Sequence, residues 1–253
     1  MNSSERRLEI FDLLLKNRTV DVGQLAEKFE VSTMTIRRDL AIYEKQGLLT
    51  TTYGGAVLNK EAVDLDAAPM LQSRFDLQTR KIGDAACRRL ENGSFIFLDT
   101  GILAVAAALS MGDMALTVVT NSLDAANILR TFPRIKLMLT PGTFDEEHGG
   151  LISSSTIAYL RQFHFDSAIL SSDYLDVTFG VSVEEETDAH IKSTVVECAD
   201  SNIVLISSEN IGKTAFAQAI PWRKMQLVIT DENASPEALG SIEKRGVAVE
   251  VAK

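Results

Sequence analysis

The chain has 253 residues, of which 45% are hydrophobic and 24% charged, and its formal net charge is −10. This composition is typical of a folded protein, and the length suits one large α/β domain with a small second module. No apolar run approaches the roughly 20 residues of a membrane span, and charged residues interrupt the N-terminal segment where a signal peptide needs an apolar core. We therefore expect a cytoplasmic protein that has no membrane partner.

The charge is unevenly distributed along the chain. Residues 1–58 hold eight Lys or Arg and eight Asp or Glu, so the later residues carry the whole net charge. A basic surface within residues 1–58 would therefore be a local feature of an otherwise acidic protein. Cys87 and Cys198 have no nearby cysteine partner, so they predict buried packing residues rather than a disulfide framework or a zinc site.

Three short helices are predicted at the N-terminus. In the first, apolar residues such as Phe11 and Leu14 recur at helical spacing, and the helix should end near Asn17. Asp21 is a suitable N-cap for the second helix, which would bury an apolar stripe around Leu25.

The third helix should follow the second almost at once. Ser32 is a suitable N-cap, and Ile36, Leu40 and Tyr43 would form the buried face before Gly47 ends the helix. Two helices joined by so short a turn predict a helix-turn-helix.

The face of the third helix opposite its apolar stripe suits the major groove of DNA. Helical geometry places Met34, Arg38 and Lys45 on this face, with Thr35 and Arg37 on its flanks. Arginine can bind guanine or phosphate, threonine can bind phosphate, and methionine can contact a thymine methyl group. The alternative is a solvated face without a ligand.

The segment "LLTTTYGGAVL", residues 48–58, predicts two short strands that turn at Gly54 and Gly55. Residues 1–58 are therefore predicted to form a winged helix-turn-helix domain whose partner is double-stranded DNA. Residues 59–80, which are polar and interrupted by Pro69, are predicted to be a linker and connecting segment.

Residues 81–253 are predicted to form an α/β domain with a mostly parallel sheet, because short β-branched runs alternate with helical patterns. The expected strands are "FIFLD", "LTVVT", "IKLMLT", "SAILSS", "NIVLIS", "LVITD" and "VAVEV". Most of them end in hydroxyl, carboxylate or amide residues, as at Asp99, Thr120, Ser171 and Asp231. Ligands of open parallel sheets bind beyond these strand ends, which predicts a small-molecule pocket. Capping of the following helices is the alternative role for the same residues.

Two further patterns bear on catalytic or metal chemistry. The sequence "SSENIGKT" ends like a phosphate-binding loop, but Ser207 stands where the first glycine is required, which argues against a nucleotide hydrolase. Lys213 of this segment could still contact an anion. His148, His164 and His190 lack the spacing of metal ligands, so neither a metal nor a cofactor is predicted.

The sequence from residue 9 to 57, with its "TIRRDL" core and its "GG" wing, closely resembles the DeoR family of bacterial transcriptional regulators, and the resemblance covers essentially the whole chain. It implies a repressor that recognises DNA through Thr33, Thr35, Arg37 and Arg38. It also implies that the second domain is a sensor related to ribose-phosphate isomerases, which binds phosphorylated sugars. The matching positions in that domain are Asp99, Gly101, Thr120, Asn121, Glu186, Lys192, Gly212, Lys213 and Asp231.

The second domain departs from the family pattern in three places. The sequence "TPGTFDEEHGG" stands where a G-G pair is expected, "SSDYLD" replaces a small, glycine-containing strand end, and the third departure is the turn "DTGILA". Ile102 and Leu103 stand where family members usually carry hydroxyl residues that would contact phosphate. Two alternatives to a metabolite-controlled repressor therefore stay open. One is an isomerase-like enzyme that uses Asp99, Glu186 and Lys192 for proton transfer, and the other is a DNA-binding scaffold that has lost its ligand.

Specific residues are predicted for both sites, and the protein is predicted to be a homo-oligomer, a dimer or higher, because one recognition helix reads only a half-site. Lys192 and Lys213 are expected to converge with Asp99 on a site for a phosphorylated or otherwise anionic polyol. The predicted DNA-binding residues are Ser32, Thr33, Met34, Thr35, Arg37, Arg38, Lys45 and Tyr53. The predicted effector-binding residues are Asp99, Thr100, Gly101, Thr120, Asn121, Glu186, Lys192, Lys213 and Asp231.

Overall fold

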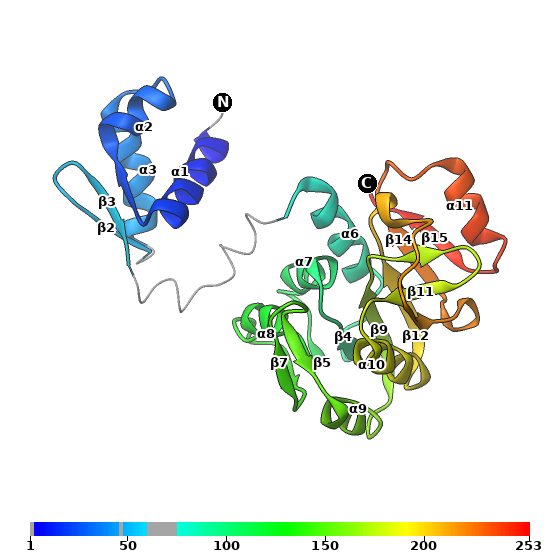
Figure 1. Cartoon of the computed structure of the whole chain (residues 1–253). Helices are drawn as coiled ribbons and strands as arrows, with labels where there is room; N and C mark the ends of the chain where they lie inside the picture. Colours follow the sequence, from blue (N-terminus) through cyan, green and yellow to red (C-terminus); the bar gives the residue numbers. More distant parts are fainter. Residues whose placement is uncertain (1–2, 46–47, 60–74) are drawn as a thin grey trace. The chain divides into compact units, whose positions relative to one another are not determined.

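The computed structural model describes residues 3–45, 48–59 and 75–253, which belong to two compact units, Met1–Ser73 and Arg74–Lys253 (Figure 1). The predicted helix end at Gly47 and most of the predicted linker lie outside the described residues. None of the helices in the described ranges is both long and apolar enough to cross a membrane.

The N-terminal unit is a winged helix-turn-helix. Its helices are α1 (Ser3–Asn17), α2 (Val22–Lys28) and α3 (Thr33–Lys45), and its strands are β1 (Thr19–Asp21), β2 (Leu49–Thr51) and β3 (Gly55–Leu58). The side chain of Asp21 accepts a hydrogen bond from the Gln24 N–H, and that of Ser32 accepts one from the Thr35 N–H, as expected of N-caps. Strands β2 and β3 are the predicted wing. Strand β1, which was not predicted, adds a third antiparallel strand alongside β3.

The three helices pack through the apolar stripes that the sequence predicts. Ile36 and Leu40 are buried, and the ring of Tyr43 stacks on Phe11 with their centroids 4.8 Å apart. The same core contains an ion pair: Arg6 Nε donates to Asp39 Oδ2 at 2.8 Å, and both side chains are largely buried. The acidic residue of the "RRDL" sequence thus faces α1 and fixes α3 in place.

The C-terminal unit is built on one parallel sheet of seven strands in the order β15-β14-β12-β9-β4-β5-β6. All seven are strands predicted from the sequence, and every pairing between neighbours is parallel. Their bounds are β4 (Phe95–Leu98), β5 (Leu116–Thr120), β6 (Ile135–Leu139), β9 (Phe165–Ser171), β12 (Ala199–Leu205), β14 (Leu227–Thr230) and β15 (Ala248–Val251). The helices are α6 (Leu77–Cys87), α7 (Ile102–Ser110), α8 (Leu123–Leu129), α9 (Ser154–Leu160), α10 (Glu186–Glu197) and α11 (Pro236–Glu243), with short 3-10 turns at Ser208–Asn210 and Trp222–Lys224.

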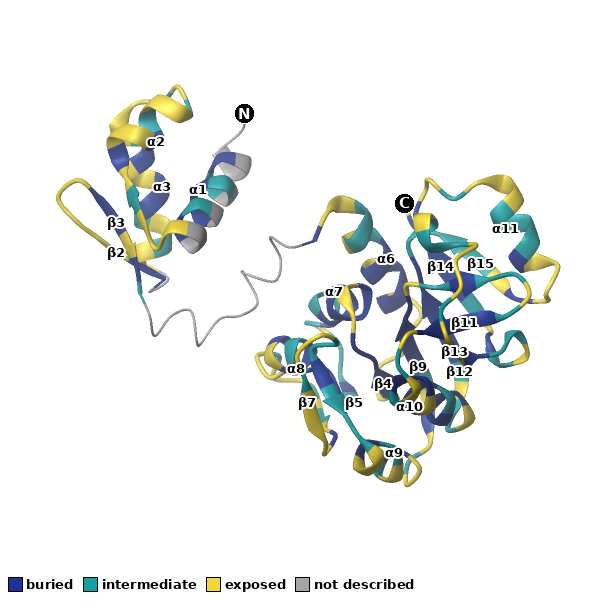
Figure 2. Ribbon diagram, viewed as in Figure 1, coloured by how far each residue is buried: buried dark blue, intermediate teal, exposed yellow. Residues whose placement is uncertain are grey.

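The central strands form the core of this unit, since residues such as Phe97, Ala168, Val204 and Val228 are fully buried (Figure 2). Such continuous burial on both faces is expected of parallel strands that helices cover. Because both faces of these strands are buried, their sequences are continuous apolar and β-branched runs and do not alternate with polar residues.

The strand order reverses between β4 and β9. From β4 the chain extends the sheet through β5 and β6 to one edge, and it then returns to place β9 on the other side of β4. The connections that follow β4 and β9 therefore leave in opposite directions and open a crevice beyond the carboxyl ends of these two strands. This topological switch point is where a ligand of an open α/β sheet binds.

Two small antiparallel sheets, which the sequence did not predict, flank that crevice. Strands β7 (Thr143–Asp145) and β8 (Gly150–Ile152) form a hairpin. Strands β10 (Leu175–Asp176), β11 (Gly180–Val183) and β13 (Ala217–Ile220) form the other sheet, and β11 leads directly into α10. The turn between β7 and β8 and the segment before β10 lie at the rim of the crevice.

Candidate functional site

The exposed face of α3 carries the residues predicted to bind DNA. Met34 is 60% exposed, and Arg37, Arg38 and Lys45 are also exposed. These cations and the apolar Met34 project from one helix whose opposite face is buried, so the helix can enter a major groove without disturbing its own core. Ser32 and Thr33 are exposed at the start of the helix.

The hydroxyl groups at the start of α3 and the wing are organised by local contacts. Thr35 Oγ1 lies 2.9 Å from Ser32 Oγ, so this pair serves the helix cap. Tyr53 is fully exposed at the turn of the wing, and its backbone oxygen accepts a hydrogen bond from Arg37 Nη2 at 3.2 Å. Arg37 thereby links the recognition helix to the wing, whereas Arg38 extends from the middle of the exposed face.

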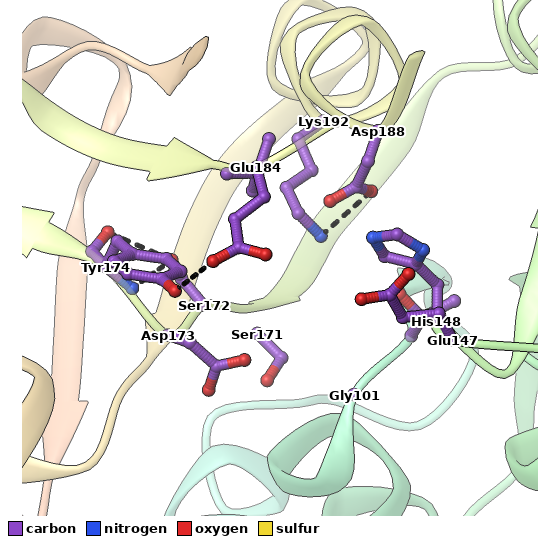
Figure 3. Close-up of a pocket in the computed structure, with 12 residues that line it drawn as sticks. Gly101, Glu147, His148, Ser171, Ser172, Asp173, Tyr174, Glu184, Asp188 and Lys192 are labelled. Carbon is purple, nitrogen blue, oxygen red and sulfur yellow. Dashed lines mark hydrogen bonds and ion pairs between the residues drawn. The ribbon is translucent and has the colours of Figure 1, made fainter. Parts of the chain in front are cut away.

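A pocket of about 220 Å³ lies in the C-terminal unit at the switch point of the sheet. Thr100 and Gly101 line it after the end of β4, and Ser171 and Ser172 line it at the end of β9. Figure 3 shows Gly101, Ser171 and Ser172 in this wall. The remaining lining residues come from the two small sheets and from α10: Glu147, His148, Asp173, Tyr174, Val183, Glu184, Asp188 and Lys192.

The base of the pocket contains one cation between two carboxylates. Lys192 Nζ donates to Asp99 Oδ2 at 2.5 Å and lies 3.4 Å from Asp188 Oδ1, one helical turn earlier on α10. All three side chains are at most 4% exposed. Burial raises the pKa of Asp99, while the Lys192 charge opposes that rise. Burial lowers the pKa of Lys192, but the charges of Asp188 and Asp99 outweigh it and keep the ammonium protonated.

His148 faces the pocket from the β7–β8 turn. Its Nδ1 lies 2.8 Å from Asp145 Oδ1, which also accepts a hydrogen bond from the His148 N–H. Burial lowers the pKa of His148, but the hydrogen bond with Asp145 and the charge of Asp188 outweigh this and raise it above the ordinary value. His148 lacks metal-ligand spacing, and the sequence contains no signal that this turn reaches the pocket.

The structure brings only part of the predicted effector site together. Asp99, Thr100, Gly101 and Lys192 form or underlie the pocket, whereas Thr120 and Asn121 are fully buried outside its lining. The amide oxygen and nitrogen of Asn121 have no hydrogen-bond partner among the described residues.

Three other predicted residues, Glu186, Asp231 and Lys213, lie outside the pocket lining. Glu186 is exposed at the start of α10 and outside the lining, so the Asp99, Glu186 and Lys192 set expected of an isomerase is not assembled. Asp231 instead accepts two hydrogen bonds from Ser208, one from its backbone N–H and one from its hydroxyl group. These bonds hold the turn that follows β12.

The expected convergence of Lys192 and Lys213 on an anion site is not formed. Lys213 is exposed, and its ammonium donates to Asn210 Oδ1 at 2.8 Å within its own turn. The turn that contains Lys213 follows β12, which is separated from β4 by β9, so the sheet order directs this lysine away from the pocket.

Gly101 is required by the geometry of the pocket wall. Its φ is +91°, and a Cβ at this position would lie 2.8 Å from Ser171 Oγ. We expect Gly101→Ala to lower the free energy of unfolding of the C-terminal unit by about 2 kcal/mol. Both the backbone strain of alanine at positive φ and the close contact with Ser171 destabilise the variant. Thermal unfolding of the full chain measures the loss.

Gly93→Ala is the matched control for this prediction. Gly93 has nearly the same φ, +92°, but nothing lies within 4 Å of its Cβ position. Its substitution should therefore show the backbone strain alone. Equal losses in the two variants would contradict the steric role of Gly101 in the pocket wall.

Comparisons with known proteins agree with this two-part architecture. A family model described as "DeoR-like helix-turn-helix domain" matches residues 6–62, and one described as "DeoR C terminal sensor domain" matches residues 77–232. The chain is 27% identical over 247 residues to the HTH-type transcriptional repressor GlcR of Bacillus subtilis, with 98% of this chain and 95% of the relative covered. It is also 27% identical over 233 residues to the glycerol-3-phosphate regulon repressor of Escherichia coli, with 91% and 92% covered.

Solved structures show more distant likenesses. Ribose 5-phosphate isomerase A of Methanocaldococcus jannaschii matches at a TM-score of 0.38 and 16% identity, with 52% of each chain covered. The full-length sorbitol operon regulator SorC of Klebsiella pneumoniae matches at a TM-score of 0.40 and 13% identity, with 96% of this chain and 99% of that chain covered. The two family matches span most of the chain and coincide with its two structural units, so the chain belongs to the DeoR family of transcriptional regulators.

Proposed function

We propose that this regulator is a repressor that acts in the cytoplasm and whose affinity for double-stranded operator DNA is controlled by a small polyhydroxylated metabolite in the switch-point pocket. The observation that carries the proposal is this pocket, in a chain whose other unit is a winged helix-turn-helix. Thr100, Ser171 and Ser172 provide hydroxyl groups, and the lining carboxylates provide acceptors, which together suit a ligand rich in hydroxyl groups.

The control requires that the metabolite bind two states of the protein with different affinity. By linkage, a ligand that prefers the state with low DNA affinity releases the operator, and operator DNA then weakens ligand binding by the same factor. Operator DNA selected from a random library, followed by a screen of metabolites for a change in operator affinity, tests this function. A binding-competent protein that no metabolite affects would contradict the control, although not the DNA binding.

DNA recognition is expected to depend on Arg38. Replacing Arg38 with alanine should cost about 1–3 kcal/mol of specific binding, because its guanidinium projects from the exposed face of α3, where it can contact a base. Fluorescence anisotropy with the selected operator and with random DNA separates the loss of specific binding from the loss of general phosphate contacts.

Lys28→Ala provides the control for Arg38→Ala. Lys28 lies on α2, and its ammonium pairs with Glu9 Oε1 at 2.7 Å rather than extending from the recognition helix. This variant also loses one positive charge and should bind the operator nearly as tightly as the parent protein. Unchanged operator affinity in Arg38→Ala would contradict the proposed role of Arg38.

We further propose that the active form is a homo-oligomer, at least a dimer. One recognition helix and one wing cover a single half-site, and specific operators of such modules contain repeated half-sites. Light scattering of the free protein and of its operator complex should give at least two chains in each particle. A single chain on the selected operator would contradict this.

A further inference from the structure

One edge of the seven-stranded sheet carries an open, apolar strand. Strand β6 forms this edge, and no strand pairs with its outer side within residues 3–45, 48–59 and 75–253. Its side chains are half-buried or exposed, and Leu139 is 41% exposed, whereas those of the neighbouring strand β5 are almost all buried. All residues of its sequence "IKLML" except Lys136 are apolar. Such an edge is a template for pairing with another strand.

The hydrogen bonds of β6 show which backbone groups face outwards. Thr140, directly after the strand, donates its N–H to Thr120 O of β5 at 3.0 Å. Successive residues of a strand point their N–H and C=O groups to opposite sides, so Lys136 and Met138 also face β5. The alternate residues therefore point their backbone groups away from β5, and these are Ile135, Leu137 and Leu139.

A second copy of β6 fits this open edge. A two-fold axis between two copies makes their edge strands antiparallel. The register centred on Leu137 pairs the whole strand and lets the two Leu137 residues exchange N–H···O bonds. Leu139 N–H then donates to the carbonyl oxygen of Ile135 in the second copy. The side chains of these three residues share one face of the sheet, so the pairing brings the apolar groups of both copies together.

The charge pattern of the strand favours this register over its neighbours. Lys136 lies opposite Met138 of the second copy, so no like charges face each other. A pair centred on Lys136 would place two ammonium groups opposite each other. A pair centred on Met138 would place Ile135 opposite Pro141, which has no N–H to donate. Residues 125–144 contain no Asp or Glu, so two copies of this acidic protein meet here without opposing carboxylates.

The opposite edge of the sheet is protected by charge. Strand β15 carries Glu250, whose Oε2 accepts hydrogen bonds from Arg89 Nε at 2.7 Å and Arg89 Nη2 at 2.5 Å. Arg88 Nη2 lies 3.6 Å from the other oxygen of Glu250. Charged side chains along an edge strand hinder its pairing with another chain. The contrast between the two edges identifies β6, and not β15, as the strand suited to association.

We propose that two copies of this protein associate through β6, which pairs antiparallel with itself and joins the two sheets into one. This names the interface of the proposed homo-oligomer and rests on that proposal. The pairing supplies the second recognition helix that an operator with two half-sites requires.

Charge variants test the interface and its register. In sedimentation equilibrium of the full-length protein, Leu139→Glu and Ile135→Lys should each raise the dissociation constant of the dimer at least about tenfold, because each places a charge opposite an aliphatic side chain. Ile135→Lys/Leu139→Glu should associate within about threefold of the parent protein, since the register places the new charges opposite each other. A double variant that associates as weakly as Leu139→Glu overturns the proposal.

Ala248→Glu is the matched control for Leu139→Glu. Ala248 is exposed on β15, so this variant adds the same charge to the other edge strand and should leave association unchanged. Equal weakening by the two variants would mean that general charge, and not the β6 edge, governs association, which overturns the proposal. Circular dichroism checks that each variant is folded.

Cysteine cross-linking is a second measurement that adds no charge to the strand. Leu137→Cys should form a disulfide-linked dimer under mild oxidation, because opposite residues with exchanged hydrogen bonds have Cα atoms about 5.5 Å apart, within disulfide range. Ala248→Cys and the parent protein, in which Cys87 is buried and Cys198 half-buried, should give no such dimer on a denaturing gel. A dimeric Leu137→Cys protein that does not cross-link, or equal cross-linking of all three proteins, overturns the proposal.

Operator binding separates this proposal from the proposed homo-oligomer. Leu139→Glu should bind an operator with two half-sites at least about tenfold more weakly than the parent protein, and a single half-site equally well. A Leu139→Glu variant that stays dimeric would support the oligomer and overturn β6 as its interface. A parent protein that is a single chain both free and on the operator would contradict the oligomer itself.

Discussion

Replacing Asp39 with alanine is expected to lower the free energy of unfolding of the N-terminal unit by about 3 kcal/mol, because it leaves a buried guanidinium unpaired. Arg6 Nε donates to Asp39 Oδ2 at 2.8 Å, and the two side chains are only 11% and 8% exposed. The same contact joins α1 to the recognition helix, so operator binding should weaken as well. Chemical denaturation of the full chain, followed by a probe in the N-terminal unit, measures the loss.

Two further variants distinguish a charge effect from a packing effect at Asp39. Glu27→Ala removes an exposed acid from α2 and should change stability by less than about 0.5 kcal/mol. Arg6→Met/Asp39→Leu removes both charges and should be clearly more stable than Asp39→Ala, since no uncompensated charge stays buried. A double variant as unstable as Asp39→Ala would show that shape, and not the unpaired charge, dominates.

Replacing Lys192 with methionine should destabilise the C-terminal unit by about 3–5 kcal/mol near neutral pH, because two buried carboxylates lose their shared cation. Lys192 contacts Asp99 at 2.5 Å and Asp188 at 3.4 Å, and Asp99 is fully buried. Thermal or denaturant unfolding measures the loss. Asp99→Asn/Lys192→Met should recover part of it, since one of the two negative charges is then absent.

The loss in Lys192→Met should depend on pH in a definite direction. Burial already raises the pKa of Asp99, and the Lys192 charge opposes that rise, so its removal raises the pKa further. A carboxyl group whose pKa is higher in the folded than in the unfolded state favours folding below the unfolded pKa and loses that contribution as pH rises through the folded pKa. The stability gap between the parent and the variant should therefore be smaller near about pH 4 than near about pH 7. A gap that stays constant or widens on acidification would contradict this account.

The three N-terminal helices, the wing and the seven strands of the parallel sheet were predicted from the sequence because their causes are local. N-caps such as Asp21 and Ser32 bond to backbone groups three residues away, and helical stripes such as Ile36, Leu40 and Tyr43 repeat within a few turns. The seven strands of the parallel sheet are indicated in the sequence by short β-branched runs, and the family resemblance indicates which residues of α3 are expected to bind DNA. Strand β1 was missed because its three residues pair with β3, far along the chain, and carry no pattern of their own.

The pocket was decided by tertiary structure. Polar residues end most of the strands, yet only those at the ends of β4 and β9 line the pocket, because the strand order reverses between these two strands. Lys213 and Asp231 follow more distant strands and serve local turns, while His148, Asp173 and Glu184 reach the pocket from small antiparallel sheets. Strand order follows from packing between residues far apart in the chain, such as the contact between Asp99 and Lys192. Periodicity extends over only a few residues, so it could indicate that polar strand ends exist but not which of them share a site.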